Sequence, residues 1–109
     1  MGCETPHYIF RTMEVKVCEL SEIENNKGKL FEIKDKKIAI FRKGEETYAL
    51  DGIFAGENIA DSKLIGYKIT IPFENIEVDI RTGKFVLVPR NKIKTYKTKV
   101  KNNNIYIKL

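Results

Sequence analysis

Histidine and cysteine are scarce in this 109-residue sequence, and tryptophan is absent: there are one His, two Cys and no Trp. A Cys/His zinc site takes four ligands, and an iron–sulfur centre of the two-Cys, two-His type takes two of each. A chain with these counts supplies neither set by itself. Cys3 and Cys18 could form at most one bridge, which excludes a disulfide scaffold.

Long hydrophobic runs are absent as well. No apolar stretch approaches the ~20 residues of a membrane-spanning helix, and none has the short apolar core of a signal peptide. The length is that of one ordinary domain. We therefore expect a soluble, cytoplasmic domain with no membrane partner. Residues 1–12 carry no clean period and are expected to form an N-terminal tail, with the folded domain at 13–109; Met13 could be the natural start.

Charge of one sign is in moderate excess, with 20 basic residues against 15 acidic ones and a net charge of +5. This balance permits contact with nucleic acid, acidic lipid or an acidic protein, and it requires none of them.

Apolar and polar residues alternate with a period of two through most of the chain from Glu14 onward, which is typical of β-strands. One helical turn is expected within 57–64, where the alternation lapses. Turn signals lie at 25–28, 43–46 and 81–83. The pattern predicts an all-β fold, a small antiparallel barrel or sandwich of eight to ten short strands. The expected strands are 15–18, 30–33, 38–41, 47–50, 67–71, 76–80, 85–88, 92–101 and 105–109.

Four stretches follow one another in a particular order: 17–23, the hairpin 38–51, 71–83 and the closing pair within 96–109. This order and spacing resemble those of a Rieske-type ferredoxin domain, from Val15 to Leu109. The resemblance implies a Rieske-type fold. Among such domains the sequence is most similar to the small subunits of NAD(P)H-dependent nitrite reductases, some of which lack the cluster ligands.

Rieske ferredoxins carry Cys-x-His in one loop and Cys-x-x-His in the next. By position, the first pair falls on Phe54 and Gly56, and the second on Ile71 and Glu74. None of the four is a thiolate or an imidazole, and a carboxylate is a hard oxygen donor that suits such a cluster poorly. The resemblance therefore implies a domain with no cluster, metal or other cofactor, in which Phe54 and Ile71 plug the former site.

A domain of this kind is expected to act by binding, as an accessory or small subunit of an oxidoreductase, with the large subunit of a redox enzyme as its partner. Rieske domains meet their partners at the tip that carries the two loops. We expect the docking surface to have Phe54 and Phe73 at its centre and Glu57 and Glu74 on its polar rim.

Catalytic residues are not assigned. Cys18 lies in a strand pattern with no His available as its base, which favours a buried structural cysteine. Acidic residues gather around the two loops, and such a cluster could serve acid–base chemistry or bind a hard cation. Glu77 and Asp79 belong to an alternating strand, however, and most simply face water. The remaining members of the acidic cluster are Glu57, Asp61 and Glu74.

A basic segment near the C-terminus supports an alternative function, nucleic-acid binding by a small barrel. Its lysines lie at even positions before Thr95 and at odd positions after Tyr96, so a bulge is expected near these two residues. Lysines on an exposed edge strand also prevent aggregation, and that explanation is preferred. The basic segment comprises Arg90, Lys92, Lys94, Tyr96, Lys97, Lys99 and Lys101.

A second alternative is an electron carrier whose cluster ligands come from another chain. It is disfavoured because the only candidate donors of this chain, Cys3, His7 and Cys18, lie far from the two loops in sequence.

Overall fold

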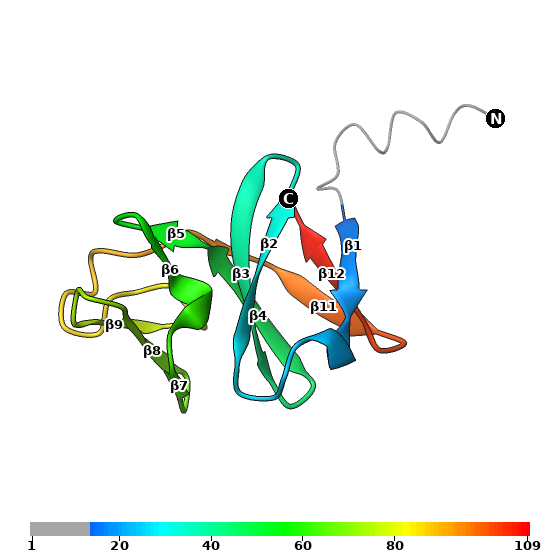
Figure 1. Cartoon of the computed structure of the whole chain (residues 1–109), viewed down its shortest axis with the longest axis horizontal. Helices are drawn as coiled ribbons and strands as arrows, with labels where there is room; N and C mark the ends of the chain where they lie inside the picture. The colour runs from blue at the N-terminus through cyan, green and yellow to red at the C-terminus, as the bar shows by residue number, and fades with distance from the viewer. Residues whose placement is uncertain (1–13) are drawn as a thin grey trace.

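The computed structural model describes residues 14–109, so the expected tail at 1–12 lies outside the described residues. Two antiparallel sheets make up one half of the molecule and its centre (Figure 1). The first sheet has the order β1 (Glu14–Glu19), β12 (Asn104–Lys108), β11 (Thr98–Lys101). The central sheet has the order β10 (Thr95–Tyr96), β4 (Glu46–Asp51), β3 (Lys36–Lys43), β2 (Gly28–Ile33).

The other half, on the left of Figure 1, is built from shorter pieces. A hairpin joins β5 (Ile53–Phe54) to β6 (Glu57–Asn58), and a three-stranded sheet has the order β7 (Leu64–Ile65), β8 (Lys68–Ile71), β9 (Ile76–Asp79). The two 3₁₀ turns are η2 (Leu20–Glu22) and η3 (Ile59–Asp61). Neither helical turn in residues 14–109 has the length and apolarity that a membrane-spanning helix needs.

Strand β3 is buried on both faces and separates two apolar cores. Successive side chains of a strand point to opposite sides, so Ile38 and Ile40 enter one core, and Ala39 and Phe41 enter the other. All four are fully buried. The body core contains Cys18, Leu20, Ile23, Ile33, Ile38, Ile40, Ala49, Ile105 and Ile107. The tip core contains Ala39, Phe41, Leu50, Ile59, Ala60, Leu64, Ile69, Ile71, Val78, Ile80 and Ile93.

The all-β fold is confirmed. Within residues 14–109, eight strands have four or more residues and four strands have only two, which is why the expected eight to ten became twelve. The helical turn expected within 57–64 is η3, and the turn expected at 43–46 joins β3 to β4.

The strand expected at 85–88 is wrong. Only isolated bridges form here, between Val78 and Phe85 and between Lys84 and Lys92. The chain instead closes on itself, because Phe85 N donates to Asn91 O and Asn91 N donates to Val88 O, both at 2.9 Å. Pro89 has no N–H to continue a ladder. We call residues 84–92 the 84–92 loop.

The single strand expected at 92–101 is also wrong. The chain reaches a strand only at β10, which pairs with β4, and then crosses to the other sheet as β11, paired with β12. The lysines change parity at this crossing, at Lys97, and not through a bulge at residues 95–96, whose register is regular. The expected outcome holds after the crossing: Tyr96, Thr98 and Val100 are half-buried, while the odd-numbered lysines are exposed.

Candidate functional site

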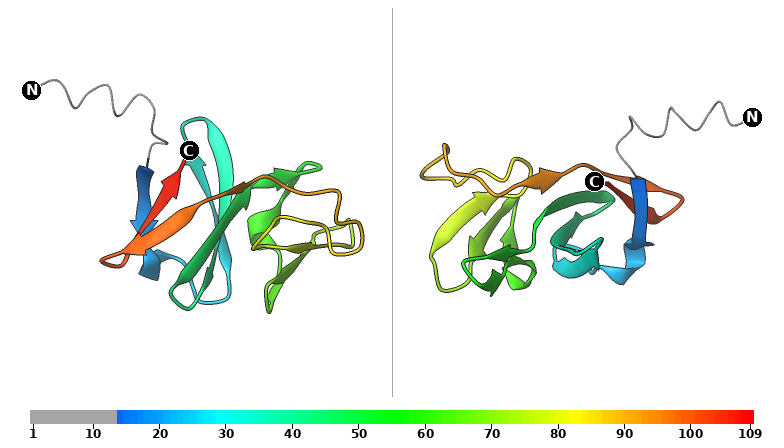
Figure 2. Two further views of the ribbon diagram at one scale, coloured as in Figure 1. Left: turned by 180° about the vertical axis from the view of Figure 1, so that it is seen from behind. Right: turned by 90° about the horizontal axis from the view of Figure 1, so that it is seen from above.

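Three loops join at the end of the molecule away from β1 and β12 (Figures 1 and 2). They are the β5–β6 hairpin at 53–58, the β8–β9 turn at 72–75 and the 84–92 loop. The rings of Phe54 and Phe85 meet edge to face with centroids 5.6 Å apart, which connects the first loop to the third. Val86 N donates to Glu77 O at 2.9 Å, which places the third loop beside β9 and its preceding turn. We call this region the three-loop tip.

The two apolar positions of the expected cluster site both belong to the tip core. Ile71 is fully buried, and Phe54 is half-buried and packed against the core. The two other positions, Gly56 and Glu74, lie in exposed turns. Two of the four expected cluster positions are therefore occupied by apolar side chains of the core, and the other two are exposed to solvent. Complete burial of side chains of this size contributes about 1.5–3 kcal/mol each, and half-buried Phe54 contributes a part of that.

Phe73 is the most exposed large hydrophobic side chain in residues 14–109, at 90%. Its φ is +68°, in the left-handed region that non-glycine residues rarely adopt, and for a bulky residue this conformation costs about 1–2 kcal/mol. The turn thus spends conformational energy to hold an aromatic ring in water. Backbone strain of this kind clusters at functional sites, and in residues 14–109 it also occurs at seven other non-glycine residues, all of them in turns.

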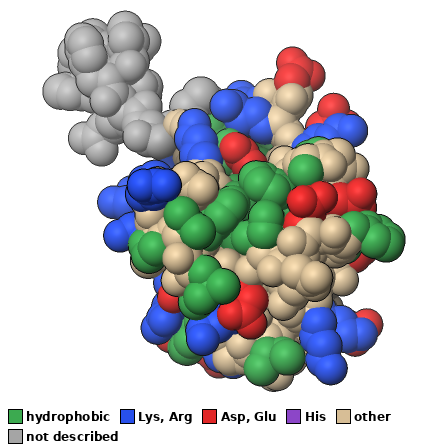
Figure 3. Space-filling model, turned by 90° about the vertical axis from the view of Figure 1, so that its left-hand side faces the viewer, with side chains coloured by type: hydrophobic (Ala, Val, Ile, Leu, Met, Phe, Trp, Pro, Cys, Tyr) green, Lys and Arg blue, Asp and Glu red, His purple; other side chains and the backbone are tan. Residues whose placement is uncertain are grey.

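Leu87, Val88 and Ile53 are the exposed tip residues that the sequence did not reveal, at 88%, 39% and 42%. The first two were assigned to a strand, where alternation would have buried one of them. Pro89 directly after Val88 is the one signal that a loop lies here. Figure 3 faces this end of the molecule and shows hydrophobic side chains gathered in the middle of the face, with acidic ones beside them.

The acidic residues around the tip do not form a metal site: no group of three His, Cys, Asp or Glu side chains suited to a metal occurs within residues 14–109. Glu74 and Glu77 are exposed and Glu57 is half-buried. Asp79 is held by Arg81, whose Nη2 lies 2.9 Å from Asp79 Oδ2. The hydrogen bond from this guanidinium lowers the pKa of Asp79 and favours the charged carboxylate of the ion pair.

Cys18 is buried in the body core, as expected. Burial, more than the nearby Glu22, raises the pKa of its thiol. A buried cysteine with a raised pKa is a poor nucleophile, so this residue is structural.

The basic segment is not one continuous face. Arg90 and Lys92 lie on the 84–92 loop, Lys94 lies ahead of β10, and Lys99 pairs with Glu14 at 3.3 Å. The ring of Tyr96 carries Lys94 Nζ at 5.1 Å from its centroid. The aromatic surface expected for base stacking is thus half-buried and already has a cation over the ring.

A family model described as a Rieske-like [2Fe-2S] domain matches residues 14–108. No curated protein matches the chain. Among solved structures, the ferredoxin of carbazole 1,9a-dioxygenase from Nocardioides aromaticivorans IC177 is 18% identical, with 89% of this chain and 98% of that chain covered and a TM-score of 0.80. The nitrite reductase [NAD(P)H] small subunit from Erwinia carotovora is 20% identical, with coverages of 88% and 81% and a TM-score of 0.76.

A third similar structure is the complex of reduced oxygenase and oxidized ferredoxin in carbazole 1,9a-dioxygenase. The identity is 20%, the coverages are 89% of this chain and 94% of that chain, and the TM-score is 0.76. At these identities the likeness shows a shared fold. Several neighbours in this fold are thus ferredoxins and nitrite reductase small subunits, and one is seen bound to its oxygenase.

The residues of the three-loop tip do not fit a Rieske cluster. Such a centre takes two thiolates and two imidazoles. Of the two Cys and one His in the sequence, Cys18 alone falls within residues 14–109, and its side chain is buried in the body core. Phe54, Gly56, Ile71 and Glu74 offer a single carboxylate among them.

Proposed function

This chain belongs to the Rieske-like [2Fe-2S] domain family, and we propose that it is a cluster-less member that works by binding a redox enzyme as a small accessory subunit. The observation that carries the proposal is the group of exposed apolar side chains on the loops of the three-loop tip, of which Phe73 and Leu87 are the most exposed. Neither side chain stabilises the domain by burial. Exposed apolar groups gathered on one surface and bordered by polar groups are typical of a protein interface.

Phe73 and Leu87 have the character of interface anchors. Both are about nine-tenths exposed, so a partner that covered them would remove nearly all of their apolar surface from water. Large side chains near the centre of an interface supply most of its binding energy. In this proposal the polar rim is supplied by Glu57, which is half-buried, and by Glu74, which is exposed. Phe54 supports the surface from below, since its ring packs on Phe85 and against the tip core.

The relatives support a redox enzyme as the partner. One of them is a ferredoxin seen in complex with an oxygenase, and another is the small subunit of a nitrite reductase. Both names describe proteins that work beside a larger redox enzyme. A chain that has kept their fold without the cluster ligands keeps the means to dock and gives up electron transfer.

The test is affinity capture of the tagged full chain from extract of its own source, with the recovered partner then purified for direct binding. We expect stoichiometric recovery of one redox enzyme whose visible spectrum belongs to the partner. Phe73→Asp and Leu87→Asp should each weaken binding of that enzyme at least tenfold. The chain alone, purified without oxygen, should hold no iron or acid-labile sulfide.

The matched control is Ile65→Asp. Ile65 is 67% exposed and lies on β7, outside the three loops, so this variant places the same charge on another exposed apolar side chain. It should bind as the wild type does, and thermal unfolding should show that all three variants fold. Normal binding by both tip variants would rule out the tip as the interface. Iron and sulfide on this chain alone would overturn the assignment of the cluster positions.

A further inference from the structure

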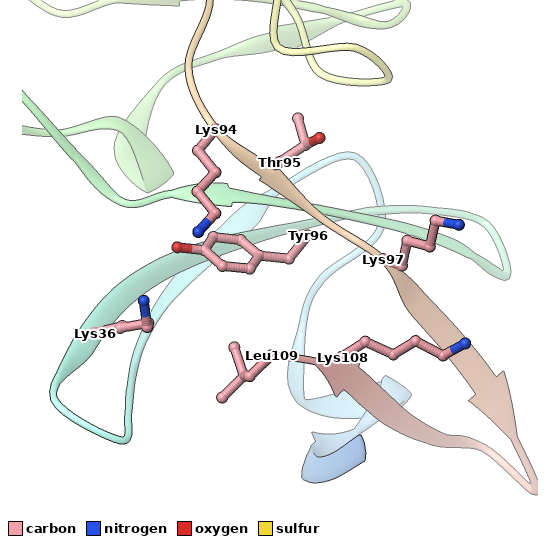
Figure 4. Close-up of a pocket in the computed structure, with 7 residues that line it drawn as sticks. All are labelled: Lys36, Lys94, Thr95, Tyr96, Lys97, Lys108 and Leu109. Carbon is pink, nitrogen blue, oxygen red and sulfur yellow. The ribbon is translucent and has the colours of Figure 1, made fainter. Parts of the chain in front are cut away.

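An open pocket lies on the body side of the molecule, where the start of β3, strand β10 and the end of β12 meet (Figure 4). Its volume is about 350 Å³, which is within the range of small-molecule sites. Four of its seven residues are lysines that come from three separate parts of the chain. The pocket is lined by Lys36, Lys94, Thr95, Tyr96, Lys97, Lys108 and Leu109.

The pocket has a net positive charge, and its lysines form no close ion pair within the described residues. The ion pairs found within residues 14–109 use Lys27, Arg81 and Lys99, and none uses a lysine of this pocket. The adjacent carboxylate of Asp51 accepts a hydrogen bond from the Tyr96 hydroxyl at 2.5 Å. Four ammonium groups outnumber the nearby carboxylates, which are the hydrogen-bonded Asp51 and the terminal carboxylate of Leu109, so the pocket keeps a net positive charge that favours an anion.

The lysines are arranged as two pairs. In Figure 4, Lys36 and Lys94 lie on the side of the pocket that holds the ring of Tyr96, and the ammonium group of Lys94 lies over this ring. Lys97 and Lys108 lie on the other side and extend away from the ring. The main chains of the second pair lie side by side, since Lys108 N donates to Lys97 O at 2.9 Å. Tyr96 lies between the two pairs and is fixed in turn by Asp51.

We propose that this pocket binds a small polyanion that carries at least two phosphate or carboxylate groups, one for each pair of lysines. The proposal goes beyond the docking function, because the pocket is built from the body of the domain and shares no residue with the three-loop tip. Ammonium groups bind phosphate and carboxylate as point charges, so the site selects charge and spacing more than the identity of the anionic group.

A small anion fits the site better than a nucleic-acid strand does. A strand needs a continuous basic track with free aromatic faces. Here the other basic-segment residues, Arg90, Lys92, Lys99 and Lys101, lie outside the pocket, and Lys94 already lies over the Tyr96 ring. The charge is concentrated in one cavity instead of extending along the segment.

The test is calorimetric titration of the full chain with pyrophosphate and with citrate at low salt. We expect saturable binding of at least one of them. Lys36→Gln combined with Lys94→Gln should weaken it at least tenfold. The control, Lys92→Gln combined with Lys101→Gln, removes the same charge from exposed positions outside the pocket and should change the affinity less than twofold. Thermal unfolding should verify that both double variants fold.

Tighter binding of pyrophosphate would assign the natural ligand to phosphorylated compounds, and tighter binding of citrate to polycarboxylates. Equal weakening in both double variants would show that only diffuse charge is involved and would overturn the proposal. Absence of binding of either anion at millimolar concentration would do the same. A single-stranded oligonucleotide that binds more tightly and loses affinity in both double variants would favour the nucleic-acid function instead.

Discussion

The body core and the tip core lie on opposite faces of one central sheet, yet the two halves are completed differently. The body core is closed by β1, β11 and β12, each of at least four residues, whereas the tip relies on two-residue strands, turns and the 84–92 loop. All of the large exposed hydrophobic side chains found in residues 14–109 belong to the tip half: Ile53, Ile65, Phe73, Leu87 and Val88. The body buries its large apolar side chains, and the tip leaves several of its own exposed to solvent.

This contrast indicates which half of the domain is held together less firmly. In a Rieske domain with its cluster, the metal centre cross-links the two loops of the tip. In this chain Ile71 is fully buried in the tip core, and Phe54 of the first loop is set edge-on against Phe85 of the third loop at 5.6 Å. We therefore expect the tip to be the less stable of the two halves and to open first.

Truncation of one core isoleucine in each half should give the largest effects. Ile107→Ala in the body and Ile71→Ala in the tip each remove a fully buried side chain, and each should cost about 2–5 kcal/mol of unfolding free energy. Ile107→Ala should weaken amide protection in both halves. Ile71→Ala should weaken protection of β8 and β9 first, with β1 and β12 still protected. Hydrogen exchange would distinguish the two variants. An equal loss of amide protection in both halves of both variants would show that the halves unfold as one unit.

The body was predictable from the sequence because its strands alternate regularly. Isoleucines at 38, 40, 105 and 107 predict strands with a buried face, and all four are buried. In the sequence, the second buried face of β3 is indicated only by apolar residues at both odd and even positions, from Ile38 to Phe41. A pattern of this kind does not tell which layers cover the strand, since that depends on segments far away in the chain.

The tip was less predictable because turns and long-range contacts shape it. The turn at 81–83 was expected, but the packing of residue 93 against it was not. A Cβ at Gly83 would lie 2.1 Å from Ile93 O, so only glycine fits at this position. Its φ of +78° also favours glycine. Leu87 and Val88 follow an apolar pattern that is the same for a strand and for an exposed loop. Of the expected docking residues, Phe73 is exposed and Phe54 is half-buried, a difference that the composition of the segment does not reveal.

Phe73→Gly should separate docking from stability at the tip. Glycine adopts φ near +68° without strain. Loss of the Phe73 ring removes almost no buried surface, because this ring is 90% exposed. The variant should be more stable than the wild type by about 1 kcal/mol, since it relieves the left-handed strain, and it should bind the partner at least tenfold more weakly. Chemical denaturation and direct binding measure the two quantities. A destabilised variant would mean that the ring packs on the domain.

Asp79→Asn should give the smallest effect, and one that depends on pH. The hydrogen bond from Arg81 lowers the pKa of Asp79 in the folded state, so the carboxylate contributes stability above its unfolded pKa of about 3.9 and loses it as the pH falls through the folded value. The variant should have a lower Tm than the wild type at pH 7, and the difference should shrink toward zero near pH 2.

Glu77→Gln is the matched control for this effect. Glu77 is exposed on the same strand and takes part in none of the ion pairs found in residues 14–109, so the variant removes one carboxylate charge without removing a partner. Its Tm should differ from that of the wild type by less than that of Asp79→Asn at pH 7. Equal Tm values for the two variants at every pH would assign the effect to net charge, and the Asp79–Arg81 pair would then contribute nothing to the order of the tip.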